Sequence, residues 1–210
     1  MRRLLLLLPL LACPAVSAKG RGEPPPPRHV LDVTLDPAAG TIAGTDRLTL
    51  PYARRVDVML HDGLEAAATC DGRAVAIEPG EPGRRTLSLQ SSCRGRDGLA
   101  TIEVTLSGRI VDPVKDEPSL HFVTGGRTSG LIMTEGEFLA GGTGWYPETG
   151  GMALYDASVT VPEAWSVVSQ GDLRSTEAVA GGRRFRYASD TPADGLAMSA
   201  GPYGVTSRDS

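Results

Sequence analysis

The 210-residue chain contains no asparagine, two lysines and three cysteines, and only 5% of its residues are aromatic. Without asparagine, the chain has no acceptor for N-glycosylation. Arginine greatly outnumbers lysine, a bias that is typical of a GC-rich bacterial genome and carries no functional information. The formal net charge is −4, and no basic patch with interleaved aromatic residues occurs. We therefore expect no nucleic-acid partner.

The sequence also lacks a hydrophobic run long enough for a transmembrane helix, which needs about 20 apolar residues. Its run from Leu4 to Leu11 follows Arg2 and Arg3 and precedes the small residues Val16-Ser17-Ala18. A basic start, a short apolar stretch and a small-residue cleavage site are the three parts of a secretory signal peptide. Residues 1–18 are therefore predicted to be a signal peptide, and the mature protein to be exported to the periplasm or the extracellular space.

An alternative processing site is centred on Cys13. The segment Leu10-Leu11-Ala12-Cys13 resembles a bacterial lipobox, in which case Cys13 carries a lipid and tethers the protein to a membrane. We expect membrane association only in that case. Residues 19–27 are rich in proline and glycine and are predicted to form an extended linker. The folded domain is predicted to span residues 28–205, with a short tail at 206–210.

Export determines how the two remaining cysteines are interpreted. In an oxidising compartment, Cys70 and Cys93 most simply form one disulfide, which would stabilise the fold by about 3 kcal/mol. Two unpaired buried thiols are the alternative. A metal site is the weakest interpretation, because no Cys-x-x-Cys or histidine-rich spacing accompanies the cysteines.

The apolar residues of the folded region repeat with a period of two, which is typical of strands with one buried and one solvated face. Glycine, proline and aspartate turns separate these runs. The sequence therefore predicts an all-β fold, an antiparallel β-sandwich or saddle, with long loops at residues 112–130 and 141–151. The alternating runs are residues 31–35, 56–60, 102–106, 157–161 and 184–187.

Two kinds of catalytic motif are absent from the chain. A zinc peptidase of the thermolysin type needs His-Glu-x-x-His, whereas His29, His61 and His121 are far apart and none begins that motif. No Gly-x-Ser-x-Gly elbow is present either, so Ser129 is interpreted as an ordinary loop residue. We expect no metal site, no cofactor and no catalysis from this chain alone.

Glu135 and Glu137 are the candidate binding residues. If both lie on one strand, carboxylates two positions apart point to the same side of the sheet. Such a pair forms either a solvated strand face or an anionic site for a cationic group.

Four segments in the second half of the chain resemble the end of the N-terminal β domain of the M1 family of zinc aminopeptidases. A weaker point of resemblance is the run Leu106 to Ile110. The four segments are Thr134-Glu135-Gly136-Glu137-Phe138-Leu139, Gly144-Trp145-Tyr146-Pro147, Val159-Thr160-Val161-Pro162 and Ala200-Gly201-Pro202-Tyr203.

The resemblance implies a role in substrate binding. In that family the N-terminal domain carries a Gln-x-Glu segment whose Glu helps hold the α-ammonium group of the peptide. Glu135 occupies the position of the Gln and Glu137 that of the Glu. Two departures from the family pattern are the Gln-to-Glu change and the replacement of an Arg-rich stretch by Gly141 to Trp145.

The resemblance also implies a division of labour. Zinc belongs only to the catalytic zincin domain that follows in this family, and we expect that domain in a longer form of the protein. The present chain is then a non-catalytic wall of the substrate cavity. It would expose a sticky face around Trp145 and Tyr146 where the catalytic domain packs. The alternative is a stand-alone periplasmic β-sandwich module that binds a peptide or protein and has no large exposed apolar patch.

Overall fold

The computed structural model describes residues 24–116 and 126–204. The predicted signal peptide, Cys13, His121, the first half of the linker and the tail 206–210 lie outside the described residues. None of the helical segments in the described part of the chain reaches the length and apolar character of a membrane span. One short 3-10 helix, at Ser91–Cys93, accompanies the strands, so the prediction of an all-β fold is confirmed.

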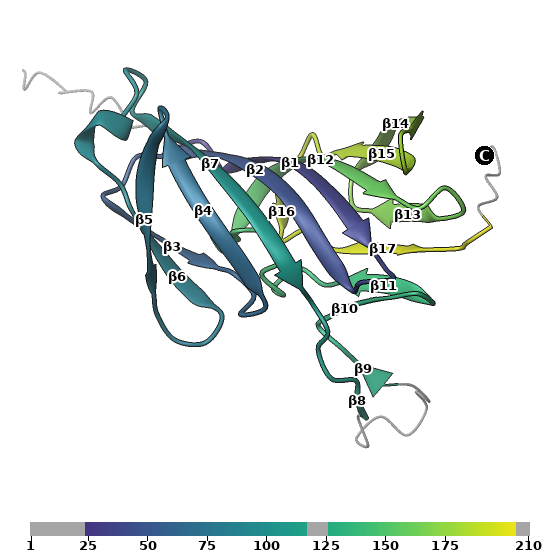
Figure 1. The fold of residues 1–210 in the computed structure, drawn as a ribbon. Coiled ribbons are helices and arrows are strands. Elements are labelled where there is room, and N and C mark those ends of the chain that lie inside the picture. Colours follow the sequence, from purple (N-terminus) through teal and green to yellow (C-terminus); the bar gives the residue numbers. More distant parts are fainter. Residues whose placement is uncertain (1–23, 117–125, 205–210) are drawn as a thin grey trace, which may run out of the picture.

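A large curved sheet forms the body of the molecule (Figure 1). Its strands are ordered β14-β15-β12-β1-β2-β7-β4-β5-β6-β3, and β16 pairs with β12 at the side. The alternating runs of the sequence form these strands, because their apolar residues pack into one layer while the polar residues face solvent. The strands are β1 (Arg28–Asp36), β2 (Thr41–Pro51), β3 (Arg55–Met59), β4 (Leu64–Cys70), β5 (Arg73–Pro79), β6 (Arg84–Ser88), β7 (Leu99–Arg109), β12 (Met152–Val161), β14 (Asp172–Val179), β15 (Gly182–Ala188) and β16 (Ala193–Asp194).

One pair of strands in the large sheet is parallel. β1 runs alongside β12 in parallel register, from Arg28 opposite Leu154 to Thr34 opposite Thr160. The prediction of antiparallel pairing is therefore wrong for this pair, although the other pairs of the sheet are antiparallel. Alternation of apolar and polar residues indicates which face of a strand is buried, and contains no information about the direction of its neighbour.

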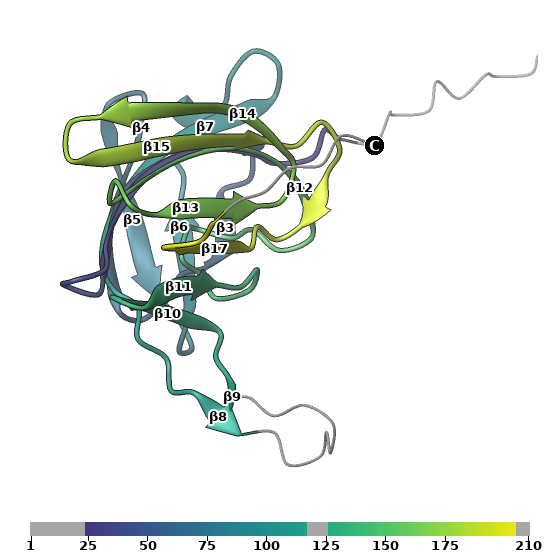
Figure 2. The ribbon, with the colours of Figure 1, turned by 90° about the vertical axis from the view of Figure 1, so that its right-hand side faces the viewer.

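A small antiparallel sheet lies against the buried side of the large one, as Figure 2 shows. Between the two sheets lies an apolar core that includes Leu35, Ile132, Val159 and Met198. A second core lies under β3, β5 and β6 at the other end of the large sheet. The strands of the small sheet, in spatial order, are β10 (Gly130–Met133), β11 (Gly136–Leu139), β17 (Met198–Gly201) and β13 (Ser166–Ser169).

The second core contains the predicted disulfide. Cys70, at the end of β4, is bonded to Cys93, in the 3-10 helix, and their Cα atoms are 5.8 Å apart. Both residues are buried among the side chains of that core. The predicted pairing of the two cysteines is therefore confirmed.

The two predicted loops differ in structure. The first includes a two-residue pairing of β8 (Lys115–Asp116) with β9 (Gly126–Arg127), which projects from the body in Figures 1 and 2. The second is fastened by Glu148, whose carboxylate accepts hydrogen bonds from the backbone N–H groups of Gly142 and Gly144, both at 2.8 Å. Glycine is required at Gly144, where φ is +74° and a Cβ would lie 2.8 Å from the backbone nitrogen of His61.

Candidate functional site

The hairpin of β10 and β11 carries both candidate glutamates, but in different environments. Glu135 lies in the turn between the strands, is exposed, and accepts a hydrogen bond of 2.9 Å from Thr134 Oγ1. Glu137 lies on β11 and is only 3% exposed. The two side chains do not share one strand face as the sequence spacing suggested, because Glu135 precedes the strand.

Among the described residues, the carboxyl group of Glu137 has no hydrogen-bond partner of good geometry. Its cross-strand neighbours are the buried residues Ile132 on β10 and Ala200 on β17. Neither carboxylate oxygen has a hydrogen-bond partner of good geometry among the described residues. Burial raises the pKa of Glu137 to about 9, and the neighbouring N–H of Ala200 offsets this only in part. The group is therefore held as a neutral acid near pH 7, and a cation or strong donor brought to it would favour the charged form.

The surface of the small sheet that points away from the large sheet is apolar, and we call it the outer face. Cross-strand register places Phe138 between Leu131 and Ser199, and Ser199 next to Val168. Phe138 is 43% exposed and Val168 is 54% exposed. Soluble monomers expose such residues singly more often than in a contiguous group. The outer face is defined by Leu131, Met133, Phe138, Val168 and Tyr203.

The sequence contains a signal for this face that the period of two does not reveal. The strands of the small sheet carry adjacent apolar residues, such as Phe138 with Leu139 and Val167 with Val168. In each of these pairs one residue is buried in the core and the other is exposed. Adjacent apolar residues on a short strand therefore marked a sheet with apolar side chains on both surfaces.

The predicted sticky face around Trp145 and Tyr146 is wrong, since both residues are 0% exposed. The indole Nε1–H of Trp145 donates to the carbonyl of Leu196 at 3.0 Å. The hydroxyl of Tyr146 accepts from the N–H of Leu196 at 3.0 Å and donates to the hydroxyl of Tyr155 at 3.2 Å. These hydrogen bonds satisfy the polar atoms of both side chains inside the core, which leaves them no surface for a partner.

A buried histidine–aspartate pair lies next to this aromatic cluster. Nδ1 of His29 and Oδ2 of Asp46 are 2.7 Å apart, and the imidazole stacks on the ring of Tyr155 with centroids separated by 5.4 Å. Burial raises the pKa of Asp46, and the interaction with His29 opposes the shift. His29 lies on β1 and Asp46 on the adjacent β2, and both are buried, so this pair joins the two strands and is not accessible to a substrate.

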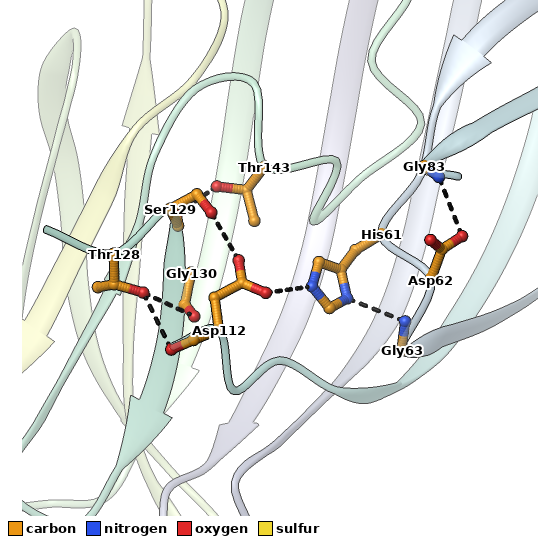
Figure 3. Close-up of polar contacts among 9 residues, drawn as sticks. All are labelled: His61, Asp62, Gly63, Gly83, Asp112, Thr128, Ser129, Gly130 and Thr143. Carbon is orange, nitrogen blue, oxygen red and sulfur yellow. Dashed lines mark hydrogen bonds and ion pairs between the residues drawn. The ribbon is translucent and has the colours of Figure 1, made fainter. Parts of the chain in front are cut away.

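The structure brings together a serine, an aspartate and a histidine that are distant in sequence (Figure 3). Oδ1 of Asp112 is 3.0 Å from Nε2 of His61, and its Oδ2 accepts a hydrogen bond of 2.7 Å from Ser129 Oγ. The other imidazole nitrogen of His61 accepts the N–H of Gly63 at 3.0 Å. Partial burial opposes ionisation of Asp112, but the hydrogen bonds from His61 and Ser129 hold its pKa below the ordinary value.

This cluster does not have the geometry of a catalytic triad. In a triad the histidine contacts the serine and removes its proton, whereas here Ser129 donates to Asp112. The imidazole cannot act as the base, because its acceptor nitrogen is already occupied by Gly63. The cluster instead joins the end of the chain leaving β7 to the start of β10. The interpretation of Ser129 as a structural residue agrees with these contacts.

Within residues 24–116 and 126–204, no group of three or more His, Cys, Asp or Glu side chains is arranged to hold a metal ion. His29 and His61 each contact an aspartate, but they belong to separate clusters.

Comparisons with known proteins give a result for the fold only. No protein-family model matches the chain, and no curated protein matches it. Among solved structures, an M1 zinc metallopeptidase from Deinococcus radiodurans matches with a TM-score of 0.64 and 16% identity, over 83% of this chain and 41% of that one. Leukotriene A4 hydrolase from Saccharomyces cerevisiae matches with a TM-score of 0.56 and 12% identity, over 82% of this chain and 28% of the hydrolase.

These matches define the class of domain to which the fold is similar. The chain has the fold of a part of the M1 zinc metallopeptidases, and the coverage is consistent with their N-terminal domain. It spans about two fifths of the Deinococcus structures and less than a third of the yeast hydrolase. The resemblance expected from the sequence motifs is therefore confirmed for the fold.

Proposed function

We propose that this chain is the non-catalytic N-terminal domain of an exported M1-type metallo-aminopeptidase-like protein. In this role the domain forms one wall of the substrate cavity, and a catalytic zincin domain supplies zinc and the general base. Glu137, assisted by Glu135, binds the free ammonium group of the peptide. One of the matched Deinococcus structures holds a Tyr-Ser-Ala peptide as substrate, which supports a peptide as the ligand of the cavity.

The observation that carries this proposal is the unpartnered carboxyl of Glu137. Burying a carboxyl without hydrogen-bond partners costs free energy, so such a group in a stable fold calls for a functional explanation. An ammonium group would supply up to three donors and a positive charge to the two unsatisfied oxygens. The position of Glu137 in the motif shared with the M1 family agrees with this role.

The outer face supports a partner domain in preference to a stand-alone module. A self-sufficient module has no need to expose Phe138 and Val168 on adjoining strands. The chain reaches this face after β17, where the carbonyl of Tyr203 accepts a hydrogen bond of 3.3 Å from Ser166 Oγ. A domain that follows β17 in a longer form would therefore start next to the surface that it has to cover.

The proposal includes export of the protein to the periplasm or the extracellular space. The alternative to a cleaved, soluble form is a lipid attached to Cys13, which would anchor the protein to a membrane. The disulfide between Cys70 and Cys93 supports an oxidising compartment, since disulfides are rare in the cytosol.

The test begins with the size of the native polypeptide, detected in its own cells with an antibody against this domain. We expect a band several times larger than the 210 residues allow. In that longer protein, Glu137→Gln should raise KM for an aminoacyl amide by about tenfold or more. The matched control is Glu65→Gln, an exposed strand carboxylate outside the hairpin. A native band of the size of this chain alone would overturn the proposal and favour the stand-alone module.

A further inference from the structure

A hollow of about 380 Å³ adjoins the outer face. It lies where the turn between β1 and β2 meets the end of β7 and the hairpin of β10 and β11. Its apolar lining continues the outer face through Leu131 and Met133, and Val111 forms an isolated bridge with Leu131. Its lining includes Pro37, Ala38, Arg109, Val111, Leu131 and Met133.

Arg109 is the cationic residue of this hollow. It is the last residue of β7, and its backbone N–H donates to the carbonyl of Gly63 at 3.0 Å, which fixes the start of the side chain. The guanidinium lies against the turn, since a Cβ at Gly40 would be 3.4 Å from its Nη2 and 3.2 Å from the carbonyl oxygen of Ile132. Gly40 has φ of +67°, so the turn approaches Arg109 closely because this residue is glycine.

Among the described residues, no carboxylate neutralises the guanidinium of Arg109. Like Arg73 and Arg183, it has no acidic side chain of the described residues within 4.0 Å, whereas Arg47, Arg55, Arg85, Arg174, Arg184 and Arg186 are each paired with an acid. A guanidinium group surrounded by apolar residues is complementary to a carboxylate flanked by apolar side chains. The guanidinium binds both carboxylate oxygens, and the flanking side chains cover the apolar lining of the hollow.

Glu135 defines the rim of the hollow on the side of the β10–β11 turn. Its side chain is already engaged by Thr134 Oγ1 and does not pair with Arg109. A negative charge at the rim repels acidic segments that are not aligned with the guanidinium, and thus restricts binding to a single carboxylate seated on Arg109.

We infer that Arg109 and its hollow form the polar anchor of the outer face, on which a partner domain docks. They bind one Asp or Glu side chain flanked by apolar residues on that partner domain. The identity of the partner as a catalytic zincin domain rests on the proposed function. The chemistry of the anchor rests on the contacts of Arg109. Arginine is enriched among the few positions that contribute most of the binding free energy of an interface.

The test uses the purified chain and two capped peptides, N-acetyl-Leu-Glu-Leu-amide and its Gln counterpart. Methyl NMR signals of Val111, Leu131 and Met133 should shift saturably with the Glu peptide, which should bind about tenfold or more tightly than the Gln peptide. Arg109→Met keeps the apolar stem and should abolish the difference between the peptides. The control Arg73→Met changes an exposed strand arginine outside the hollow and should leave the difference intact.

Equal binding of the two peptides, no saturable shift, or shifts confined to another surface would overturn the inference. Persistence of the difference in Arg109→Met would do the same, because the carboxylate would then be bound elsewhere. The peptides replace the partner, so this result is independent of the size of the native polypeptide. Failure of the anchor can therefore be distinguished from failure of the proposed function.

Discussion

The two ends of the molecule differ in how completely they satisfy their own side chains. At the end formed by β3 to β6, the apolar residues pack into one core and a disulfide joins Cys70 to Cys93 inside it. At the end formed by the small sheet, the carboxyl of Glu137 is buried without a partner and the outer face exposes Phe138 and Val168. The first end leaves a single buried hydroxyl, that of Tyr52, without a partner, whereas the second leaves both oxygens of a carboxyl and an apolar face without partners among the described residues.

A comparison of two buried glutamates shows that the lack of hydrogen-bond partners is specific to Glu137. Glu148 and Glu137 are 6% and 3% exposed, and both lie close to the small sheet or its loops. Burial raises the pKa of Glu148, but the N–H groups of Gly144 and Gly142 oppose the shift. Glu148 is therefore a structural acid that fastens a loop, while Glu137 has no comparable structural contact.

The largest predicted effect is on the pH dependence of stability at Glu137. Its pKa of about 9 in the folded protein exceeds the ordinary value of 4.5, so the folded state binds more protons than the unfolded state between these two pH values. Stability is then lost as the pH rises through this window. At about pH 8, Glu137→Leu should increase the free energy of unfolding by on the order of 4 kcal/mol, and below about pH 4 by little.

The measurement is denaturant unfolding of both proteins across this pH range. Glu148→Leu is the matched control, and it should instead lower the free energy of unfolding by about 3 kcal/mol, because it leaves two buried N–H groups without acceptors. If Glu137→Leu were destabilising at about pH 8 as well, Glu137 would have a structural partner and the contrast between the two glutamates would be lost.

The fold was largely predictable because it depends on local patterns. The runs 31–35 and 102–106 became β1 and β7 with their apolar residues inward, since burial of one face is encoded in alternation. The parallel pairing of β1 with β12 was not predictable from that pattern. The parallel pairing depends on which edge of β1 is still unpaired when β12 forms, more than a hundred residues later in the chain. The alternation of apolar and polar residues is the same for a parallel and an antiparallel neighbour.

The site was less predictable, because it depends on contacts between distant segments. Asp112 is 51 residues from His61 and 17 from Ser129, so no local sequence motif predicts that the three side chains form a cluster. Tyr146 illustrates a second limit, since an aromatic residue before a proline suits a core and an interface equally well. Glu137 was identified from a short motif, whereas its burial depends on β17, at the far end of the domain.

The next largest effect is predicted at the opposite end of the molecule. The disulfide closes a loop with a sequence separation of 23, and constraining the unfolded chain over that length is worth about 3 kcal/mol. The double variant Cys70→Ala/Cys93→Ala should lose about this amount in denaturant unfolding, and reduction of the native protein should have a similar effect. A loss much smaller than 1 kcal/mol would indicate that the core of β3 to β6 does not depend on the bond.

The smallest effect on stability is predicted for the outer face, where Phe138→Ser and Val168→Ser should change the free energy of unfolding by less than about 0.5 kcal/mol each, as is usual for surface positions. Both substitutions should reduce dye binding to exposed apolar surface and self-association in sedimentation velocity, because they remove apolar area from a face that water covers.

Leu139→Ala, one residue from Phe138 but fully buried, is the control and should lower the free energy of unfolding by about 2–5 kcal/mol. A loss of several kcal/mol in Phe138→Ser would mean that its ring already packs within the chain. The small sheet would then be as complete as the disulfide end, and the contrast between the two ends would reduce to Glu137 alone.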